Sequence, residues 1–404
     1  MTESKIRSLD DLVVATHQSR HILTLFSGGL DSTYVLNFLS SRNCKVTALS
    51  VDVGEGTDHR ELRSIAARFG VDLVVADARE EFARDAVLPA IRAQAKYMGI
   101  YPVSSSLSRP ILARTAVSFA EKLGCDAIVH TANQSQNSLR RLNGAIQQLG
   151  FCGWFGTPYE FSAISRKEKI ETLKAGGLAK FSSRGVSGDA NLWCREFESG
   201  SLDSPEFFVV PNELFKWTVP SPNQPVRGEI TIGFQAGIPT LLNGSPVPLL
   251  ELIARLNCEV GRFGIGRYCG LEHLEFGEKV LEVREAPAAM LLMDAARHLG
   301  TATLDAELLR EKISLEQLWV REAIEGRWFG ALREALDSFM LRATQGVSGS
   351  VSYRLRQGTA EACAIKAVSP LYLTDRDTWE RTVAQQRGRS QFKTPTPAVE
   401  REFA

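Results

Sequence analysis

Residues 27–33 read SGGLDST and decide the fold, because they join the apolar run at residues 22–26 to the helical pattern at residues 34–39. Glycine has no Cβ and adopts positive φ readily, so two adjacent glycines let backbone N–H groups converge on an anion. The hydroxyls add donors, and the positive end of the following helix favours phosphate oxygens. The stretch therefore predicts a phosphate cradle rather than an ordinary strand-to-helix turn with Asp31 as N-cap.

The same stretch differs from two common phosphate loops. It lacks the Gly-Lys-Ser/Thr of a Walker loop and the third glycine of a dinucleotide loop. It resembles the SGGxDS loop of the ATP pyrophosphatases, which split ATP between its α and β phosphates and pass adenylate to an acceptor oxygen. On that resemblance, ATP is the expected cofactor.

Composition bounds the class of protein. A chain of 404 residues with 44% hydrophobic residues is long for one core, so two domains and a tail are expected. Lys+Arg 47 against Asp+Glu 47 leaves no net charge to draw the chain to nucleic acid or to an anionic membrane. The expected partners are therefore small molecules.

The cysteines and the N-terminus indicate a cytoplasmic protein. The seven cysteines are scattered, with no Cys-x-x-Cys pair and no histidine at metal-ligand spacing, so they are expected to be reduced thiols. The first twenty residues are polar, and no apolar run is long enough to span a bilayer.

Short apolar runs alternate with helical patterns in the first half of the chain. Strands are predicted at 46–51, 73–76 and 127–130, and helices at 60–69 and 110–123, the latter starting at Pro110 and stopping at Gly124. This alternation predicts an α/β fold with a doubly wound parallel sheet. Ligands of such sheets gather at the carboxyl ends of the strands, so the cradle and segments 52–55 and 131–143 should converge on one cleft.

The texture changes after a Ser/Gly-rich passage at residues 182–188. An α+β domain follows, with a strand at 229–234, a turn at 243–246 and helices at 248–262 and 286–299. Beyond residue 378 the chain is rich in Arg, Gln, Thr and Pro, which is typical of a loose tail or an arm that orders on a partner. The expected division is a polar extension at 1–21, a nucleotide-binding domain at 22–182, a synthetase domain at 183–377 and a tail or oligomerisation arm at 378–404.

Many stretches, in order over residues 23–373, resemble the argininosuccinate synthase family. They are SGGLDST, VDVGE, LPAIRAQAKY, SSSLSRPILAR, NLWCREFESGSLDSP, EITIGFQAGIP, PLLELIARLN, GIGR, VREAPAA and SPLYL. The resemblance implies a cytoplasmic ligase of amino-acid metabolism and arginine biosynthesis, tetrameric in the family. In that family the ureido oxygen of citrulline attacks the α-phosphate of ATP, pyrophosphate leaves, and the aspartate amine then displaces AMP.

The resemblance also assigns site residues. It implies that Asp31, Asn137 and Arg141 carry the chemistry and that Asp31 orders Mg²⁺ on the phosphates. The nucleotide would be held by Phe26, Ser27, Gly28, Gly29, Asp31, Ser32 and Thr33, with the backbone near Val51 against the adenine. The acceptor would be held by Tyr97, Ser106, Arg141, Ser187 and Glu272, with Asn137 between acceptor and donor. The alternatives are a partly exposed ion pair for Arg141 and Glu272, and a packed aromatic for Tyr97.

The chain departs from the family at a second loop. Residues 130–138 read HTANQSQNS where the family has HGxTGKGND, so three glycines and a lysine are replaced. Non-glycine residues at positive φ cost roughly 1–2 kcal/mol each, so a different loop path is expected. Asn133 replaces the threonine, and Ser138 replaces the acid that contacts the aspartate amine. A different amine donor, such as a hydrazine or hydroxylamine, is therefore expected.

The acceptor side also departs. Arg284 stands where the family has a tyrosine that contacts citrulline, and Glu196 stands where it has a serine. One hypothesis is an acceptor other than citrulline, or one used besides it, with a differently placed charge. The alternative is that Arg284 and Glu196 pair with each other. The tail also lacks the family's usual closing helix sequence, which puts the tetramer in question.

The leading hypothesis is thus an adenylating C–N ligase with altered substrates. One alternative is a genuine argininosuccinate synthase. Sulfur-inserting ATP pyrophosphatases that act on tRNA need a reactive cysteine pair or a basic appendage, and neither is found in the sequence. A non-catalytic nucleotide sensor is suggested by the altered second loop, but the intact residues 27–33 argue against it.

Overall fold

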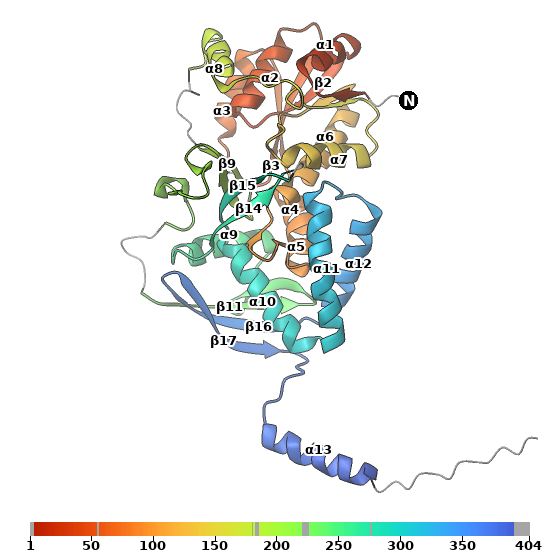
Figure 1. The fold of residues 1–404 in the computed structure, drawn as a ribbon, viewed down its shortest axis with the longest axis vertical. Helices are drawn as coiled ribbons and strands as arrows, with labels where there is room; N and C mark the ends of the chain where they lie inside the picture. The colour runs from red at the N-terminus through yellow and green to blue at the C-terminus, as the bar shows by residue number, and fades with distance from the viewer. Residues whose placement is uncertain are drawn as a thin grey trace, which may run out of the picture.

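The computed structural model of the chain describes residues 4–54, 56–179, 181, 186–219, 226–274 and 277–391. Figure 1 shows an N-terminal domain stacked on a C-terminal domain, with one helix, α13, standing apart from both. The residues on either side of the expected domain boundary, 182 and 183, lie outside the described residues, as do residues 392–404 of the tail.

The N-terminal domain is built on a six-stranded sheet in the order β1-β8-β7-β2-β3-β4. Every pairing is parallel, which confirms the predicted doubly wound α/β sheet. The central strands β2 and β7 are neighbours although they are distant in the sequence, so the loops that follow them face each other at the point where the strand order reverses. The strands are β1 (Lys5–Ile6), β2 (His21–Leu25), β3 (Lys45–Asp52), β4 (Asp72–Asp77), β7 (Ala127–Val129) and β8 (Trp154–Gly156).

Helices cover this sheet. One predicted start was wrong: α6 begins at Ser105, with Pro110 inside it, because its first turn is buried and held by packing rather than by local propensity. Its predicted end is confirmed, since Gly124 adopts φ 63° as a left-handed C-cap. The helices are α1 (Leu9–Gln18), α2 (Leu30–Ser40), α3 (His59–Arg68), α6 (Ser105–Leu123), α7 (Ser138–Gln148) and α8 (Arg166–Ala175).

The polar N-terminal stretch is part of this domain rather than an extension from it. Strand β1 pairs with β8 at the sheet edge, and Ser8 with Asp11 forms a capping box that starts α1. Ile6, Leu12 and Ala15 are fully buried. Although α1 is mostly polar, it has a narrow apolar face that is buried against the domain.

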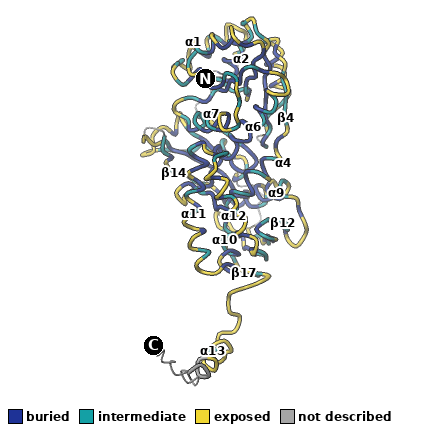
Figure 2. Tube along the Cα trace, turned by 90° about the vertical axis from the view of Figure 1, so that its right-hand side faces the viewer, coloured by how far each residue is buried: buried dark blue, intermediate teal, exposed yellow. Residues whose placement is uncertain are grey.

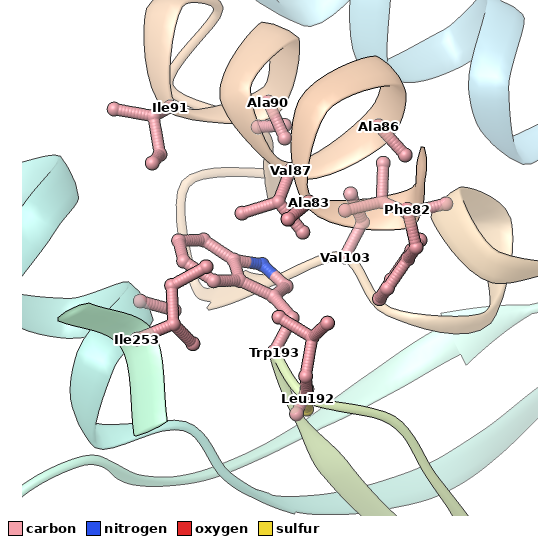
Figure 3. Close-up of a cluster of buried hydrophobic side chains, with 14 of the residues drawn as sticks. Phe82, Ala83, Ala86, Val87, Ala90, Ile91, Val103, Leu192, Trp193 and Ile253 are labelled. Atoms are coloured by element: carbon pink, nitrogen blue, oxygen red, sulfur yellow. The ribbon is translucent and has the colours of Figure 1, made fainter. Parts of the chain in front are cut away.

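A shared core joins the two domains (Figure 3). Trp193 is fully buried beside Val87 and Ile253, which come from opposite sides of the junction. The Leu192 N–H donates to the carbonyl of Val53 at 2.9 Å, and a Cβ on Gly54 would lie 2.6 Å from that of Leu192. The segment after β3 is thereby fixed against the C-terminal domain. The elements here are α4 (Arg79–Phe82), the π-helical η1 (Ala83–Val87), α5 (Leu88–Arg92), β5 (Lys96–Tyr97) and β6 (Tyr101–Pro102).

The C-terminal domain contains two antiparallel sheets and several helices, which confirms the predicted α+β fold of this part of the chain. The four-stranded sheet runs β14 (Arg267–His273), β15 (Lys279–Glu285), β10 (Arg195–Glu198) and β9 (Ser187–Ala190). The five-stranded sheet runs β13 (Ser245–Pro246), β12 (Ile238–Leu242), β11 (Gly228–Gln235), β16 (Gly349–Arg356) and β17 (Thr359–Ala367). The helices are α9 (Leu249–Gly261), α10 (Pro287–Thr303), α11 (Ala306–Ile324) and α12 (Ala331–Thr344), with short 3₁₀ turns η2 (Gly200–Leu202) and η3 (Asn212–Leu214).

The last described element, α13 (Arg376–Gln391), lies away from the body, and its residues 376–386 are exposed apart from the partly buried Val383 (Figures 1 and 2). The segment leading to it exposes Leu371 and Leu373, and the helix exposes Trp379. Among the described residues, no helix is long and apolar enough to cross a membrane. All seven cysteines lie in described segments and are free thiols.

Candidate active site

The phosphate cradle, residues 27–33, follows β2 and opens α2. Gly28 has φ 72°, and a Cβ there would lie 2.4 Å from Leu62 Cδ2, so this position requires glycine. Gly29 is the N-cap of α2 and has no side-chain cap, and a Cβ on it would meet only Ser27 Oγ, at 3.4 Å. The helix start is thus bare of protein on its open side, as an anion site needs.

The hydroxyls of the cradle are not equivalent. Ser27 Oγ and Ser32 Oγ lie 3.3 Å apart, and Ser32 Oγ donates to the carbonyl of Gly29 at 3.1 Å. Thr33 is fully buried, so its hydroxyl does not line the open face. Phe26 and Val51 are buried at the ends of β2 and β3, and the Phe26 N–H donates to Leu49 O at 2.8 Å. The carboxyl ends of β2 and β3, beside the cradle, are therefore apolar.

Asp31 lies in the first turn of α2 and is held by two residues. Lys169 Nζ of α8 is 2.7 Å from Asp31 Oδ1, and the hydroxyl of Tyr159 donates to the carbonyl of Asp31 at 3.1 Å. The side chain of Asp31 remains 34% exposed, so it is partly accessible to solvent although Lys169 holds one of its oxygens.

The second loop, residues 130–138, follows β7. None of its residues adopts a positive φ, so the loop takes a path on which side chains replace glycines without backbone strain. Asn133 Oδ1 accepts from the N–H and the hydroxyl of Ser135, at 3.1 and 2.7 Å, so its side chain is used inside the loop. Burial lowers the pKa of His130 to about 4, so this histidine is neutral at pH 7.

At the start of α7, Ser138 contacts a cation. Arg109 Nε donates to Ser138 Oγ at 3.0 Å, and the same guanidinium forms an ion pair with Asp189 of β9. Gln136 Nε2 donates to Glu198 Oε1 at 3.1 Å. Sequence reasoning missed Arg109, Asp189 and Glu198, which bring charges of both signs to the second loop.

Glu272 is the centre of a buried network that we call the arginine–glutamate cluster: Arg141, Glu196, Glu272, Glu282 and Arg284. Glu272 Oε1 accepts from Arg141 Nη2 at 2.7 Å and from Asn137 Nδ2 at 2.8 Å. Glu272 Oε2 accepts from Arg284 Nη2 at 3.2 Å and from the Tyr101 hydroxyl at 3.3 Å. Every lone pair of this carboxylate is therefore engaged.

Arg284 connects the rest of the cluster. Its Nη2 is 3.2 Å from Glu196 Oε2 and 3.3 Å from Glu282 Oε2, and its guanidinium lies 4.3 Å from the centre of the Tyr101 ring. The Arg284 side chain is 2% exposed. Arg284 and Glu196 do pair, as one of the two alternatives proposed, but Arg284 also bonds the predicted acceptor residue Glu272.

Charge is unevenly distributed within the cluster. Burial opposes ionisation of Glu272, but Arg141 and Arg284 outweigh it and bring the pKa of that carboxyl to about 2. Burial raises the pKa of Glu196 and of Glu282, which Arg284 only partly offsets. The cluster thus holds one carboxyl group whose pKa its arginines lower and two carboxyl groups whose pKa burial raises.

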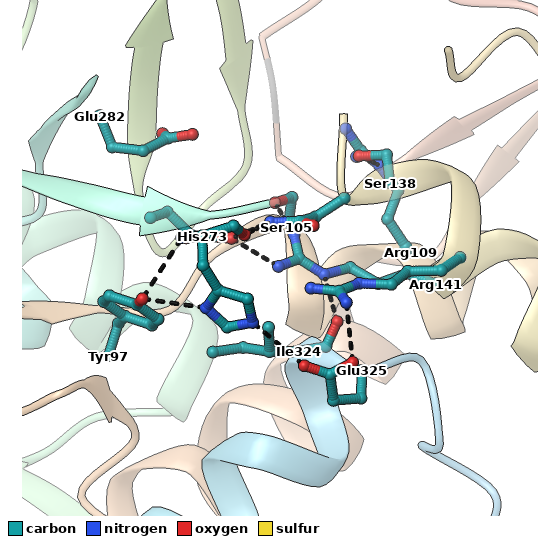
Figure 4. Close-up of polar contacts among 12 residues, drawn as sticks. Tyr97, Ser105, Arg109, Ser138, Arg141, His273, Glu282, Ile324 and Glu325 are labelled. Atoms are coloured by element: carbon teal, nitrogen blue, oxygen red, sulfur yellow. Dashed lines mark hydrogen bonds and ion pairs between the residues drawn. The ribbon is translucent and has the colours of Figure 1, made fainter. Parts of the chain in front are cut away.

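Figure 4 places Arg141 at the junction of the domains. Its Nη1 donates to Ser105 Oγ at 2.8 Å and its Nε to the carbonyl of Ile324 at 3.1 Å. Arg141 and Glu272 do form the ion pair of the predicted alternative, but their side chains are only 3% and 4% exposed, so the pair is buried rather than partly exposed. A fixed, buried guanidinium of this kind is suited to orienting an anionic or carbonyl group.

The remaining predicted acceptor residues lie at the edge of the cluster. The Tyr97 hydroxyl is 3.0 Å from His273 Nδ1, and the Tyr97 ring stacks on Tyr101 with centroids 5.4 Å apart. Ser106 is buried one residue beyond the Ser105 that bonds Arg141, and Ser187 is exposed on β9. Tyr101 and Ser105 are thus in more direct contact with Arg141 and Glu272 than the predicted Tyr97 and Ser106. For Ser105 the signal was the register of the SSSLSRP stretch, residues 104–110, which does not include Tyr101.

A hollow that is open to solvent lies beside the second loop. Asn137, Gln136 and Gln134 line it from the loop, and Arg7 and Glu160 from the other side. Asn137 therefore touches both this hollow and Glu272, consistent with its predicted place between two ligands.

Comparison with known proteins covers both domains. Residues 21–178 match the family described as "Arginosuccinate synthase N-terminal HUP domain", and residues 186–392 match "Arginosuccinate synthase C-terminal domain". An argininosuccinate synthase of Rubrobacter xylanophilus is 35% identical over 89% of each chain. One of Symbiobacterium thermophilum is 36% identical over 88% of this chain and 90% of its own. The solved NMN synthetase of Francisella tularensis is 11% identical with a TM-score of 0.31, over 42% of this chain and 68% of its own.

Proposed function

The chain belongs to the argininosuccinate synthase family, and on that premise we propose that it is an ATP-dependent ligase that adenylates a ureido or carbonyl oxygen and then forms a C–N bond. The observation that carries the proposal is the facing of two loops at the strand-order reversal, one with a bare helix start and one leading to Arg141 and Asn137. A nucleotide bound on the first loop would present its α-phosphate toward an acceptor held by the second.

Two displacements make up the reaction. The acceptor oxygen attacks the α-phosphorus of ATP and pyrophosphate leaves with the bridging oxygen; the donor amine then attacks the acceptor carbon and AMP leaves with the acceptor oxygen. Both steps depend on positioning and on fixed donors. In the proposal, Ser27, Gly28, Gly29 and Ser32 hold the phosphates, with the apolar sheet end of Phe26 and Val51 against the adenine. Arg141 and Asn137 orient the acceptor.

Mg²⁺ is the metal that such a reaction implies. Magnesium is bound through one or two carboxylates plus substrate phosphates rather than by an all-protein cage. Asp31 fits that role, since one of its carboxylate oxygens is paired with Lys169 while the side chain stays partly exposed at the cradle. No group of three or more His, Cys, Asp or Glu in the described segments forms a ready-made metal site. When bound, Mg²⁺ would neutralise phosphate charge.

Citrulline and aspartate are the first candidate substrates, because the curated relatives are argininosuccinate synthases over nearly their whole length. This favours the genuine synthase over a ligase with altered substrates. On the donor side, Glu198 and Asp189 lie close to the second loop. In the proposal, one of these carboxylates contacts the donor amine in place of the acid that Ser138 replaces. In the proposal, Asn133 positions Ser135 within the loop, and Ser138 with Arg109 faces the donor.

A second candidate is the same reaction on an acceptor that carries a different charge. The observation in its favour is that Arg284 occupies Glu272 Oε2 and that Tyr101 and Asn137 take further positions on this carboxylate. A ligand ammonium would have to displace a guanidinium, whereas a ligand carboxylate would be attracted to one.

The test is pyrophosphate release from ATP by the full chain, first with citrulline alone and then with L-aspartate added. Citrulline-dependent pyrophosphate release, followed by aspartate-dependent AMP release, is the expected result. Release with another ureido or carbonyl acceptor but not with citrulline would favour the second candidate. Dependence on tRNA, or nucleotide binding without turnover across the acceptor panel, would overturn the proposal.

We also propose that the protein is a cytoplasmic homo-oligomer. Helix α13 and the strip Leu371, Leu373 and Trp379 are exposed away from the body, and such apolar groups are typical of an arm that packs on another copy. Removal of residues 371–404 should lower the oligomer's mass in light scattering. An unchanged mass would contradict the proposed arm.

A further inference from the structure

Lys169 is a buried lysine at the edge of the phosphate cradle. Its ammonium lies 2.7 Å from Asp31 Oδ1 and 4.1 Å from the centre of the Tyr159 ring, and its side chain is 9% exposed. It projects from α8, which packs on α2, the helix that the cradle opens (Figure 1). A full positive charge is therefore fixed beside the first turn of α2.

Helix packing alone does not explain this lysine. Only Lys169 and Leu173 of α8 are buried, so α8 presents one narrow face to α2. A buried ion pair is weak evidence for stability, since apolar residues of similar volume commonly serve as well. Its partner Asp31, a residue of the cradle, keeps 34% of its side chain exposed, so the pair is partly open to solvent instead of being sealed between the helices. The placement favours a role toward a ligand.

The cradle needs a cation that its own loops do not contain. Residues 27–33 and 130–138 include no lysine or arginine. His130 is neutral at pH 7, because burial lowers its pKa to about 4. Among the ion pairs of the described segments, only that of Lys169 with Asp31 involves residues 27–33. The helix start contributes only about half an elementary charge, which is far less than a polyphosphate carries.

We propose that Lys169 binds the β- and γ-phosphate oxygens of ATP and remains on the pyrophosphate as it leaves. This rests on the proposed function and adds a catalytic residue to it. As the acceptor oxygen bonds to the α-phosphorus, the bond from that phosphorus to the bridging oxygen breaks and its electron pair departs on pyrophosphate. Lys169 keeps its proton throughout and stabilises the growing charge as a point cation.

The test separates the two halves of the nucleotide. Binding of inorganic pyrophosphate and of AMP is measured by calorimetry, with Mg²⁺ present, on the wild type and on Lys169→Met, Lys169→Arg and Lys167→Met. Lys167 lies on the same helix with its side chain 85% exposed, so it is the matched control for loss of a lysine. We expect Lys169→Met to weaken pyrophosphate binding about tenfold or more and AMP binding less than twofold. Lys169→Arg should recover part of the loss, and Lys167→Met should behave as wild type.

Three outcomes would overturn the inference. Unchanged pyrophosphate affinity in Lys169→Met would remove the contact, and an equal loss for AMP and pyrophosphate would mean that Lys169 only supports the fold of the cradle. If the wild type binds neither pyrophosphate nor ATP, both the inference and the proposed function are contradicted. If the wild type binds pyrophosphate tightly and Lys169→Met binds it equally well, only the inference is contradicted. Should Lys169→Met fail to fold, Lys169→Gln decides by the same comparison of the two ligands.

Discussion

The cradle and the arginine–glutamate cluster lie at the same end of the sheet, yet they are built in opposite ways. The cradle is seven consecutive residues with few contacts outside their own turn, and its helix start carries no side-chain cap. The cluster gathers residues from α7, β10, β14 and β15, and its charges already satisfy one another. A site for a ligand common to many enzymes can be local and open, whereas a site for a particular acceptor is assembled at long range.

The strongest test of this contrast is Glu272→Gln. The change leaves Arg141 and Arg284 buried with no ionised partner at the cluster's centre, and breaking a buried pair in this way costs about 3–5 kcal/mol. Chemical unfolding of the full chain at pH 7 measures the loss. Glu278→Gln, on the exposed turn before β15, is the control. A loss no larger than the control's would mean that the cluster is not held by Glu272.

The cradle should show the reverse behaviour, with function lost and fold kept. Gly29→Val adds a side chain whose Cβ meets only Ser27 within the protein but which intrudes on the predicted phosphate site, so pyrophosphate release should fall by roughly a hundredfold or more, about 3 kcal/mol. The thermal midpoint should stay near that of the wild type.

Gly28→Val is the matched comparison for Gly29→Val. Its φ of 72° and the 2.4 Å approach to Leu62 predict that it destabilises the fold as well as the activity. Wild-type turnover in Gly29→Val would remove the cradle from the site, and equal stability of the two variants would remove the structural distinction between the glycines.

The second loop lies between these two extremes, and Ser138 tests it. Ser138→Asp places a carboxylate beside the donor subsite, and a charged hydrogen bond of this kind is worth about 1.5–3 kcal/mol, or roughly tenfold or more in capture of the adenylated intermediate by L-aspartate. The measurement is AMP release at limiting aspartate. Ser135→Asp adds the same charge at an exposed position of the loop and should have little effect. A slower reaction in Ser138→Asp would indicate that Asp189 and Glu198 already fill this role.

A smaller effect is expected from opening the cluster itself. Arg284→Tyr combined with Glu196→Ser frees Glu272 Oε2 for a ligand ammonium, so the KM for citrulline should fall by about tenfold, the equivalent of one additional charged hydrogen bond. The readout is citrulline-dependent pyrophosphate release over a range of citrulline concentrations. An unchanged KM would mean that Arg284 and Glu196 pair with each other without affecting acceptor binding.

The same contrast explains what the sequence predicts. The parallel sheet, the glycine-rich turn between β2 and α2 and the left-handed end of α6 at Gly124 follow from local patterns, and the structure confirms them. Phosphate binding at that turn stays a prediction. Two features do not follow from local patterns. Helix α6 begins before Pro110, because burial of its first turn outweighs the preference of proline for a helix start. Strand β1 joins the sheet although its segment is polar, because it pairs with the edge strand β8. Arg141, Glu272 and Arg284 were found through the resemblance. Tyr101, Ser105 and Arg109 were missed, because each contacts a charged partner that lies more than thirty residues away in the sequence. Local patterns do not indicate such contacts.

The smallest predicted effect distinguishes two carboxyl groups that bond the same guanidinium. Burial raises the pKa of Glu282 well above its ordinary 4.5, so ionisation of this residue favours the unfolded state once the pH exceeds that value. Glu282→Gln removes this cost and keeps an oxygen for Arg284, so the variant should gain about 1 kcal/mol relative to the wild type at pH 7. The gain should shrink as the pH falls toward 4.5, because both states of the wild type then bind the proton.

For Glu272, whose pKa is lowered to about 2, the sign is opposite: its ionised form stabilises the fold above pH 4.5, and that stability is lost as the pH falls toward 2. Unfolding curves of both glutamine variants from pH 2 to 8 would show the two slopes, that of Glu272 below pH 4.5 and that of Glu282 above it. If Glu282→Gln destabilises the fold as much as Glu272→Gln does, the division of charge within the cluster is wrong.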